Sequence, residues 1–338
     1  MASRRVLITA RAFFSAGAKA AEPLIEGGLE VVRAPRFGPL PEAELILALQ
    51  GASAVIASSD PYNERVFAAA PDLRIVARTG VGYDSVDIAA ATRHGVVVVL
   101  TPGRIAETVA DFAFGLMLAL ARRIPEASTL MRHGGWAAEL PGTDLWSKCL
   151  GVVGMGAVGT AVARRALGFG MRVLGYDPAV GEALIAERGA EPADLDGLLT
   201  QADFITLHAA LTNESRRLID AAALARMRPK AILVNTARGG LIDTDALLEA
   251  LDAGHLAGVA LDAFDQEPLP AEHPLRHAPR CLLTPHIAFS TRENSLDMSR
   301  RAAIAVAEVL AGRRPPADVR VLNPEVSGPP SGSTERRG

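Results

Sequence analysis

The sequence predicts an α/β protein made of two domains, each with a parallel sheet covered by helices. Three observations support this fold class. At 338 residues, the chain is long for a single hydrophobic core. Short runs rich in β-branched residues and leucine alternate with longer segments of helical pattern, as in parallel strands joined by helices. The alternation forms two separate series, so we expect one sheet per domain.

The first series of strands occupies the N-terminal third of the chain. The turn residues Thr101-Pro102-Gly103 follow its last strand and mark a domain boundary. A long apolar helix is then expected from about Arg104. The expected strands of this series are residues 6–9, 30–33, 54–57, 74–77 and 96–99.

The second series lies in the middle of the chain, and a last long helix, residues 291–311, follows it. We expect this helix to return to the first domain, which would make that domain discontinuous. The predicted domains are 1–102 with 289–322 for the substrate domain, and 103–288 for the dinucleotide-binding domain. Residues 323–338, rich in Pro, Gly and Ser, are expected to form a disordered tail. The expected strands are residues 150–153, 172–176, 204–207, 232–235, 258–261 and 281–283.

Composition argues against several classes of protein. The net charge of -3, without a block of like charge, argues against a nucleic-acid or acidic-membrane surface. The most apolar stretch, residues 108–121, is too short to cross a bilayer, and the apolar run near the N-terminus stops at Arg11 without forming a signal core. Cys149 and Cys281 are far apart, so we expect no disulfide and a cytoplasmic location. The spacing of the histidines predicts no metal site.

The clearest motif is Gly154-Met155-Gly156-Ala157-Val158-Gly159, between an expected strand and a helix starting near Ala157. In such a loop the first glycine allows a tight turn and the second lets the backbone approach a pyrophosphate. The third lets the helix lie close to the strand. The helix N-terminus offers N–H groups and partial positive charge to phosphates. We therefore predict a dinucleotide site at Gly154, Gly156, Ala157, Val158 and Gly159.

An aspartate defines which dinucleotide is expected. The strand after the glycine motif ends at Asp177, where a carboxylate can accept hydrogen bonds from ribose hydroxyls and repel a 2′-phosphate. Pro178 and Ala179 follow it, so no adjacent arginine is offered to such a phosphate. The cofactor predicted is NAD rather than NADP. The alternative is a glycine-rich turn with an aspartate cap and no ligand.

Three polar residues follow strand ends in the same domain: Arg238, Glu267 and His286. Ligands gather at this edge in open α/β sheets. Arginine can hold carboxylate and carbonyl oxygens with a planar fork, and histidine can accept a hydroxyl proton near neutral pH. A neighbouring carboxylate orients the imidazole and favours its protonated form. Each residue alone also has a structural interpretation, as a loop cap, a solvated charge or a helix-terminal residue. Together, behind a dinucleotide motif, they predict oxidation of a 2-hydroxy acid.

The order of these segments resembles the D-isomer-specific 2-hydroxyacid dehydrogenase family over nearly the whole chain. The resemblance implies Arg238 as substrate anchor, His286 as acid and base, and Glu267 as its partner. The segments that carry the resemblance are Arg78-Thr79-Gly80-Val81-Gly82-Tyr83-Asp84, the glycine motif with Asp177, 235–240, Ala260-Leu261-Asp262 with Glu267-Pro268, and Thr284-Pro285-His286.

The resemblance also implies contacts beyond the catalytic set. Backbone amides around Val81 and Gly82 would bind the substrate carboxylate. The fold implied is two Rossmann-like or flavodoxin-like domains, and homodimers are usual, with the helices after the first domain packing together. Further cofactor contacts are expected at Thr108, Thr236, Ala237, Asp262 and His286, with Asp262 on the nicotinamide carboxamide.

The sequence leaves two kinds of substrate possible, an acid with a phosphate group and an acid without one. The phosphoglycerate dehydrogenase branch looks closest, and Arg78 stands where that branch has an arginine, so we predict that Arg78 binds substrate. Ala57 stands where that branch has a second arginine, which weakens the case for a phosphate. Ala210 replaces the family's usual proline and should adjust a cofactor loop. The regulatory domain that many members carry at the C-terminus is not expected.

We therefore predict a cytoplasmic, homodimeric, NAD-dependent oxidoreductase. It would move a hydride between the nicotinamide and a small D-2-hydroxy or 2-keto acid, either 3-phosphoglycerate-like or hydroxypyruvate- or glyoxylate-like. An alternative from another class is an NAD(H)-sensing, corepressor-like regulator, because fold alone does not establish catalysis. The complete Arg–Glu–His set favours turnover.

Overall fold

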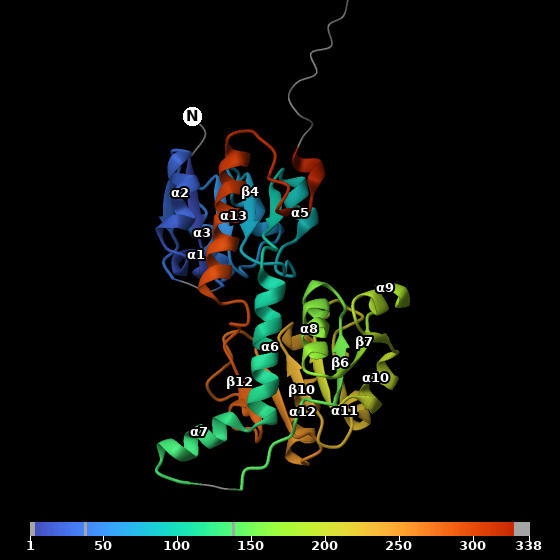
Figure 1. Cartoon of the computed structure of the whole chain (residues 1–338). Coiled ribbons are helices and arrows are strands. Elements are labelled where there is room, and N and C mark those ends of the chain that lie inside the picture. Colours follow the sequence, from blue (N-terminus) through green and yellow to red (C-terminus); the bar gives the residue numbers. More distant parts are fainter. Residues whose placement is uncertain (1–3, 37–38, 137–138, 328–338) are drawn as a thin grey trace, which may run out of the picture. The chain divides into compact units, whose positions relative to one another are not determined.

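The computed structural model describes residues 4–36, 39–136 and 139–327 (Figure 1). The chain divides into two compact units, one formed by residues up to Ile105 and from Ser290 onward, the other by Ala106–Phe289. Each unit has its own sheet, dominated by parallel strand pairs. The predicted α/β class, with two doubly wound domains, is confirmed.

The sheet of unit 1 has the order β13-β5-β4-β3-β1-β2. Strands β1 to β5 are parallel in the flavodoxin-like order, and β13 pairs antiparallel with β5. Every residue of β3, β4 and β5 is buried, which explains their continuous apolar runs. The strands are β1 Arg5–Ile8, β2 Glu30–Arg33, β3 Ala54–Ala57, β4 Ile75–Arg78, β5 Val97–Leu100 and β13 Arg320–Val321.

Two strands of this sheet end one residue later than predicted. Pairing of β4 with both neighbours continues through Arg78, opposite Ala57 on β3 and Leu100 on β5. Cross-strand pairing, which the local pattern does not contain, shifts both strands by one residue without lengthening them. Arg78 is thereby the last residue of a central strand rather than the first residue of a loop.

The long C-terminal helix α13 (Arg292–Leu310) packs on α1, α2, β3 and β4 of unit 1, as Figure 1 shows. Its buried face is rich in small residues, including Ala302, Ala303 and Ala305. This confirms that the first domain is discontinuous. The other helices of unit 1 are α1 Arg11–Ser15, α2 Ala18–Glu26, α3 Glu42–Ala48, α4 Glu64–Ala68, α5 Ile88–Arg93 and the 3-10 helix η3 Pro324–Ser327.

The segment after β13 differs from the prediction of a disordered tail from Asn323. Asn323 is fully buried: its side chain accepts from Val98 N at 2.9 Å and donates to Val96 O at 2.8 Å. These bonds satisfy backbone groups of β5 that would otherwise lack partners. The prediction was therefore wrong for residues 323–327, because it rested on composition and not on individual contacts. Residues 328–338 lie outside the described residues.

The sheet of unit 2 has the order β12-β11-β10-β9-β6-β7-β8, with all pairs parallel. The chain leaves β6 toward β8 and then returns to β9 on the other side of β6. This reversal is the Rossmann switch point, where ligands bind at the carboxyl ends of the strands. The strands are β6 Cys149–Val153, β7 Arg172–Tyr176, β8 Glu191–Pro192, β9 Phe204–Leu207, β10 Ile232–Asn235, β11 Gly258–Leu261 and β12 Cys281–Leu283.

Helices cover both faces of this sheet. One apolar cluster joins α6 and α8 to the strands through residues such as Phe114 and Val162, and the other joins α10, α11 and α12 through Leu198, Leu224 and Leu251. Along the described chain, no helix combines the length and apolarity that a membrane span requires. The helices of unit 2 are α6 Ile105–Ala121, α7 Ile124–Arg132, α8 Ala157–Gly168, α9 Glu182–Glu187, α10 Leu195–Gln201, α11 Ala221–Arg226, α12 Thr244–Asp252, η1 Gly239–Leu241 and η2 Pro274–Arg276.

Candidate active site

The glycine motif joins β6 to α8 by a turn that other residues could not form. Gly154 has φ of 95°, in the left-handed region, and a Cβ there would lie 2.4 Å from Ala209 N. A Cβ on Gly159 would lie 2.0 Å from Gly154 O, so the helix touches the turn directly. The backbone itself therefore forms the surface at the carboxyl end of β6.

This surface fits a dinucleotide. A Cβ on Gly156 would meet no described atom within 4 Å, which leaves space beside the loop. The first turn of α8 contains Ala157, Val158, Gly159 and Thr160, so its N–H groups and dipole meet no competing carboxylate of that turn. In the loop after β10, the buried hydroxyl of Thr236 has no hydrogen-bond partner among the described residues. An orphaned buried hydroxyl is the kind of group that a polar ligand completes.

Asp177 follows β7 and holds the glycine loop. Its Oδ2 accepts from Met155 N at 2.8 Å, and its Oδ1 accepts from Ala179 N at 2.9 Å. Arg188, at the C-cap of α9, donates from Nη1 to Met155 O. Arg188 was not expected near Asp177, because it lies eleven residues later in the sequence and α9 brings it back to the loop.

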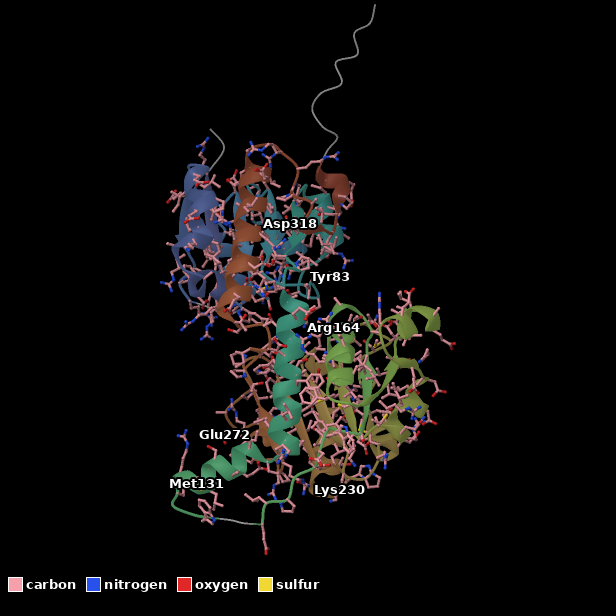
Figure 2. The ribbon with its side chains drawn as sticks, viewed as in Figure 1. Tyr83, Met131, Arg164, Lys230, Glu272 and Asp318 are labelled. Atoms are coloured by element: carbon pink, nitrogen blue, oxygen red, sulfur yellow. The ribbon has the colours of Figure 1, made fainter. Side chains whose placement is uncertain are left out.

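Thr108, a predicted cofactor contact, lies in the first turn of α6. The neighbouring Glu107 forms ion pairs with Arg164 at 2.7 Å and Arg165 at 2.9 Å, both on α8 (Figure 2 labels Arg164). The charged pairs attach this turn to the helix that begins with the glycine motif. The charges of Glu107, Arg164 and Arg165 are visible in the sequence, but the pattern does not indicate that they form ion pairs.

His286 and Glu267 form the central pair of unit 2. His286 Nδ1 lies 2.6 Å from Glu267 Oε2, and Glu267 Oε1 accepts from Phe264 N at 3.0 Å. Burial alone would raise the pKa of Glu267, but the hydrogen bond with His286 and the charges of His286 and Arg238 lower it below its ordinary value. The carboxylate is therefore ionised and acts as acceptor. The Nδ1 proton is then held by Glu267, which leaves Nε2 for a substrate.

The segment carrying His286 is shaped by Asp262, which follows β11 and is fully buried. Its carboxylate accepts three hydrogen bonds: from Thr284 Oγ1 at 2.6 Å, Ile287 N at 2.9 Å and Ala288 N at 2.8 Å. His286 itself has φ of 52°, a conformation uncommon outside glycine. The aspartate bonds on both sides of His286 hold it there. The contact of Asp262 with the nicotinamide carboxamide stays a prediction.

Arg238 follows β10 on a turn braced from within. The buried Asn235 side chain donates to Arg238 O at 2.7 Å and accepts from Ala237 N at 2.9 Å. A Cβ on Gly239 would lie 2.1 Å from Phe264 C, so this turn packs against the loop that leads to Glu267. Our prediction named Arg238 and not its supports. Both supports could have been suspected from the sequence, because Asn235 ends the strand and Gly239 follows the arginine.

In unit 1, the loop after β4 presents backbone groups. Gly80 N donates to Arg78 O and to Thr101 Oγ1, each at 3.1 Å. The next three N–H groups, of Val81, Gly82 and Tyr83, donate no hydrogen bond to any described residue. Tyr83, labelled in Figure 2, is 43% exposed and Val81 is 40% exposed. A run of unpaired N–H groups is suited to an anion.

Arg78 lies beneath this loop rather than on its surface. The residue is 6% exposed, and its Nε and Nη2 donate to Gly82 O at 3.0 and 2.7 Å. The structure thus brings together the three residues of unit 1 that we predicted to bind substrate. It assigns to Arg78 a contact with the chain that the sequence did not indicate.

Comparison with known proteins agrees with this geometry. Residues 114–288 match the family described as D-isomer specific 2-hydroxyacid dehydrogenase, NAD binding domain. A glyoxylate reductase of Korarchaeum cryptofilum is 44% identical over 273 residues, 79% of this chain and 81% of that protein. A D-3-phosphoglycerate dehydrogenase of Synechocystis is 39% identical over 85% of this chain, which spans only 52% of that relative.

A solved structure agrees as well. The TT0316 protein of Thermus thermophilus has a TM-score of 0.82 and 41% identity, covering 92% of this chain and 98% of that one. The two curated relatives are enzymes by name, so the alternative of an NAD(H)-sensing regulator gains no support. This chain belongs to the D-isomer specific 2-hydroxyacid dehydrogenase family and is an NAD-dependent enzyme of 2-hydroxy and 2-keto acids.

Proposed function

We propose that this enzyme reduces a small 2-keto acid without a phosphate group, of the glyoxylate or hydroxypyruvate kind. The catalytic assignment rests on one observation: His286 Nδ1 lies 2.6 Å from Oε2 of the ionised Glu267. Ala57 supports the absence of a phosphate group, because it removes a cation at the end of β3. The glyoxylate reductase relative, matched over 81% of its length, supports the same choice.

The proposed roles in unit 2 follow from donor geometry and charge. Bound NADH supplies the hydride. Arg238 holds the carboxylate and the carbonyl oxygen through its fork of N–H donors. His286 gives a proton from Nε2 to the carbonyl oxygen, and in the reverse direction takes the hydroxyl proton. Glu267 keeps the ring oriented through Nδ1 and stabilises the imidazolium that gives the proton.

The proposed binding residues complete this assignment. From unit 1, the unpaired amides at Val81 and Gly82 would bind the substrate carboxylate. For the cofactor, the glycine motif and the N-terminus of α8 would hold the pyrophosphate, and Asp177 the adenosine ribose. The remaining proposed cofactor contacts are Thr108, Thr236, Ala237, Asp262 and His286.

A panel of 2-keto acids tests the substrate class, with NADH oxidation followed by absorbance. We expect the highest kcat/KM for glyoxylate or hydroxypyruvate, ahead of phosphohydroxypyruvate. Pyruvate serves to measure the tolerance for a methyl group. A higher kcat/KM for phosphohydroxypyruvate than for hydroxypyruvate would contradict the proposal.

We also propose a homodimer formed through α7. Every residue of this helix is at least partly exposed, and Ile124, Met131 and the following Trp136 are 53%, 54% and 84% exposed. Figure 1 shows α7 projecting from unit 2, and Figure 2 labels Met131 on it. A short helix with no buried face gains stability only by packing on another surface, and a two-fold contact lets the same surface serve both copies.

Measurement of the solution mass tests the dimer. The native enzyme should elute as a dimer, and a variant with Met131→Glu and Ile124→Glu should dissociate into monomers. Leu184→Glu, which changes a similarly exposed apolar residue on α9, is the control and should leave the dimer intact. A native monomer would overturn the proposal.

A cytoplasmic location is proposed from the cysteines. Both thiols are free. Burial raises the pKa of Cys281 to about 12 and also raises that of Cys149, so both stay protonated and unreactive. Free thiols, here one buried and one half-buried, are typical of proteins of reducing compartments.

A further inference from the structure

We propose that Arg78 is a positioning residue, and that buried Asp60 is its counter-charge. Together they would set the conformation of the amide loop, which we define as residues 79–83. The guanidinium would act on the chain and not on the substrate. This inference rests on the proposed function in one respect: the amide loop is taken to bind the substrate carboxylate.

Arg78 contacts the amide loop directly. Two nitrogens of one guanidinium donate to the same carbonyl, Gly82 O, at 3.0 and 2.7 Å. In a trans peptide the C=O and N–H point in opposite directions. Fixing Gly82 O beneath the loop therefore turns the N–H of Tyr83 away from Arg78. A charged donor makes this a stronger restraint than an ordinary turn bond.

Asp60 follows β3 and is fully buried. Its carboxylate accepts from Thr9 Oγ1 at 2.5 Å, from Leu40 N at 2.9 Å and from Ser58 N at 3.2 Å. The pKa of Asp60 is raised overall because of burial, and these hydrogen bonds and the charge of Arg78 only oppose that rise. The carboxylate thus connects the loops after β1 and β3, and its charge interacts with that of Arg78, the last residue of β4.

A third buried group, the phenol of Tyr62, interacts with both charges. Tyr62 is fully buried, and its hydroxyl has no hydrogen-bond partner among the described residues. Burial, and after it the charge of Asp60, raise the pKa of Tyr62 well above its ordinary value, so the phenol stays neutral. Asp60, Arg78 and this neutral phenol are all buried, so little solvent reaches the two charges. The attraction between Asp60 and Arg78 is therefore less screened than that of a surface pair.

These contacts give the two roles of Arg78 different consequences. A guanidinium that binds substrate directly would favour acids that carry a second anionic group. A guanidinium that positions amides would affect every 2-keto acid through its shared carboxylate. The ratio of kcat/KM for phosphohydroxypyruvate and hydroxypyruvate separates the two roles.

The test uses Arg78→Gln, Arg78→Lys and the control Arg74→Gln in the full-length enzyme. Arg74 is exposed just before β4, at the opposite end of the strand. For Arg78→Gln we expect KM to rise about 10- to 100-fold, which is the usual loss for a charged hydrogen bond. The rise should be similar for phosphohydroxypyruvate and for hydroxypyruvate. The change in kcat should be smaller, and the Kd of NADH should stay constant. Arg78→Lys should recover part of the loss, and Arg74→Gln should match the native enzyme.

A loss confined to phosphohydroxypyruvate, with its kcat/KM ratio to hydroxypyruvate falling about tenfold or more, would make Arg78 a substrate ligand and overturn the proposal. Asp60→Asn supplies a second variant. If the two residues act as one unit, the double variant Asp60→Asn with Arg78→Gln should lose less than the product of the single losses. If the loss in the double variant equals the product of the two single losses, Asp60 acts independently of Arg78 and is not its counter-charge.

Amide hydrogen exchange provides a readout that does not depend on activity. Gly80 N and Val86 N are hydrogen-bonded at the two ends of the amide loop. Both should exchange faster in Arg78→Gln and at the native rate in Arg74→Gln. Unchanged exchange in a folded Arg78→Gln enzyme would overturn the positioning role. If the native enzyme turned over none of the acids, the proposed function would fail, and the exchange experiment would still decide the role of Arg78.

Discussion

The two sheets use their carboxyl ends in different ways. In unit 2 the loops present ionisable side chains, with His286 held by Glu267 at 2.6 Å and Arg238 close enough to lower the pKa of Glu267. In unit 1 the exposed groups are backbone amides, and the charged side chains of Arg78 and Asp60 are buried. Proton transfer needs side chains that change charge, whereas holding a carboxylate needs only fixed donors. Changes in unit 2 should therefore act mainly on kcat and changes in unit 1 mainly on KM.

The largest effect should come from His286→Ala. Loss of the general acid should lower kcat by roughly 10²- to 10⁴-fold while NADH still binds. Stopped-flow measurement of hydride transfer and fluorescence titration of NADH would separate the two steps. His277→Ala, on the loop after η2, is the matched control and should keep native kcat. A His286→Ala variant with near-native kcat would show that His286 does not transfer the proton, and would contradict the assignment of proton transfer to unit 2.

Glu267→Gln should have the next largest effect. An amide of the same shape keeps a hydrogen bond to Nδ1 but loses the charge that stabilises the imidazolium, so kcat should fall about 10- to 100-fold. Because the pKa of native Glu267 is lowered, its carboxylate stays ionised until the pH falls below its ordinary value near 4.5. The native pH–rate profile should consequently show no loss from Glu267 above that pH. A Gln variant with native kcat at every pH would show that the charge is not needed.

Asp177→Ala should change cofactor choice more than rate. Removing the carboxylate removes the repulsion of a 2′-phosphate, and Arg188 already contacts the adjacent loop at Met155 O. The ratio of kcat/KM for NADH over NADPH should fall by about two- to fivefold, which corresponds to one exposed ion pair of up to about 1 kcal/mol. The double variant Asp177→Ala with Arg188→Ala should return part of the preference. An unchanged ratio in the single variant would assign the preference to another residue.

The smallest effect on activity is expected at His208, after β9, whose Nε2 lies 2.9 Å from Thr206 Oγ1. Burial lowers the pKa of His208 from 6.5 to about 3, so the unfolded chain binds a proton there before the folded protein does. Folding stability should fall as the pH decreases from 6.5 toward 3, by at most about 1.4 kcal/mol per pH unit from this residue. Urea unfolding of native enzyme and His208→Gln at several pH values would measure this. Equal slopes for both proteins would show that His208 does not contribute.

Local pattern was sufficient for much of the nucleotide site. Gly154 needs a left-handed backbone and Gly159 close contact with the turn, and both requirements act within the short glycine motif. The order strand, glycine loop, helix and aspartate could therefore be predicted from neighbours in the chain. The same holds for strands β3 and β9, whose predicted bounds agree with the structure. Two-residue strands such as β8 and β13 have too few residues for any pattern, and they were not predicted.

Contacts between residues far apart in the chain could not be predicted from local sequence pattern. Asn323 begins a segment rich in Pro and Gly, yet it bonds to β5 more than two hundred residues earlier in the chain. Arg188 and Asp177 meet the same loop from different elements. Hydrogen-bond partners of this kind depend on which strands are neighbours, and the order of strands is a property of the folded sheet.

The amino-acid sequence alone determined the α/β class, the turn that presents the glycine motif, and the placing of Arg238, Glu267 and His286 after strand ends. These follow from residue periodicity and backbone conformation, which act over a few neighbouring positions. Only the tertiary structure decided where each charge points: Glu267 toward His286, and Arg78 inward to Gly82 O. A charged side chain is long and takes the best partner within reach, and folding brings those partners from other strands.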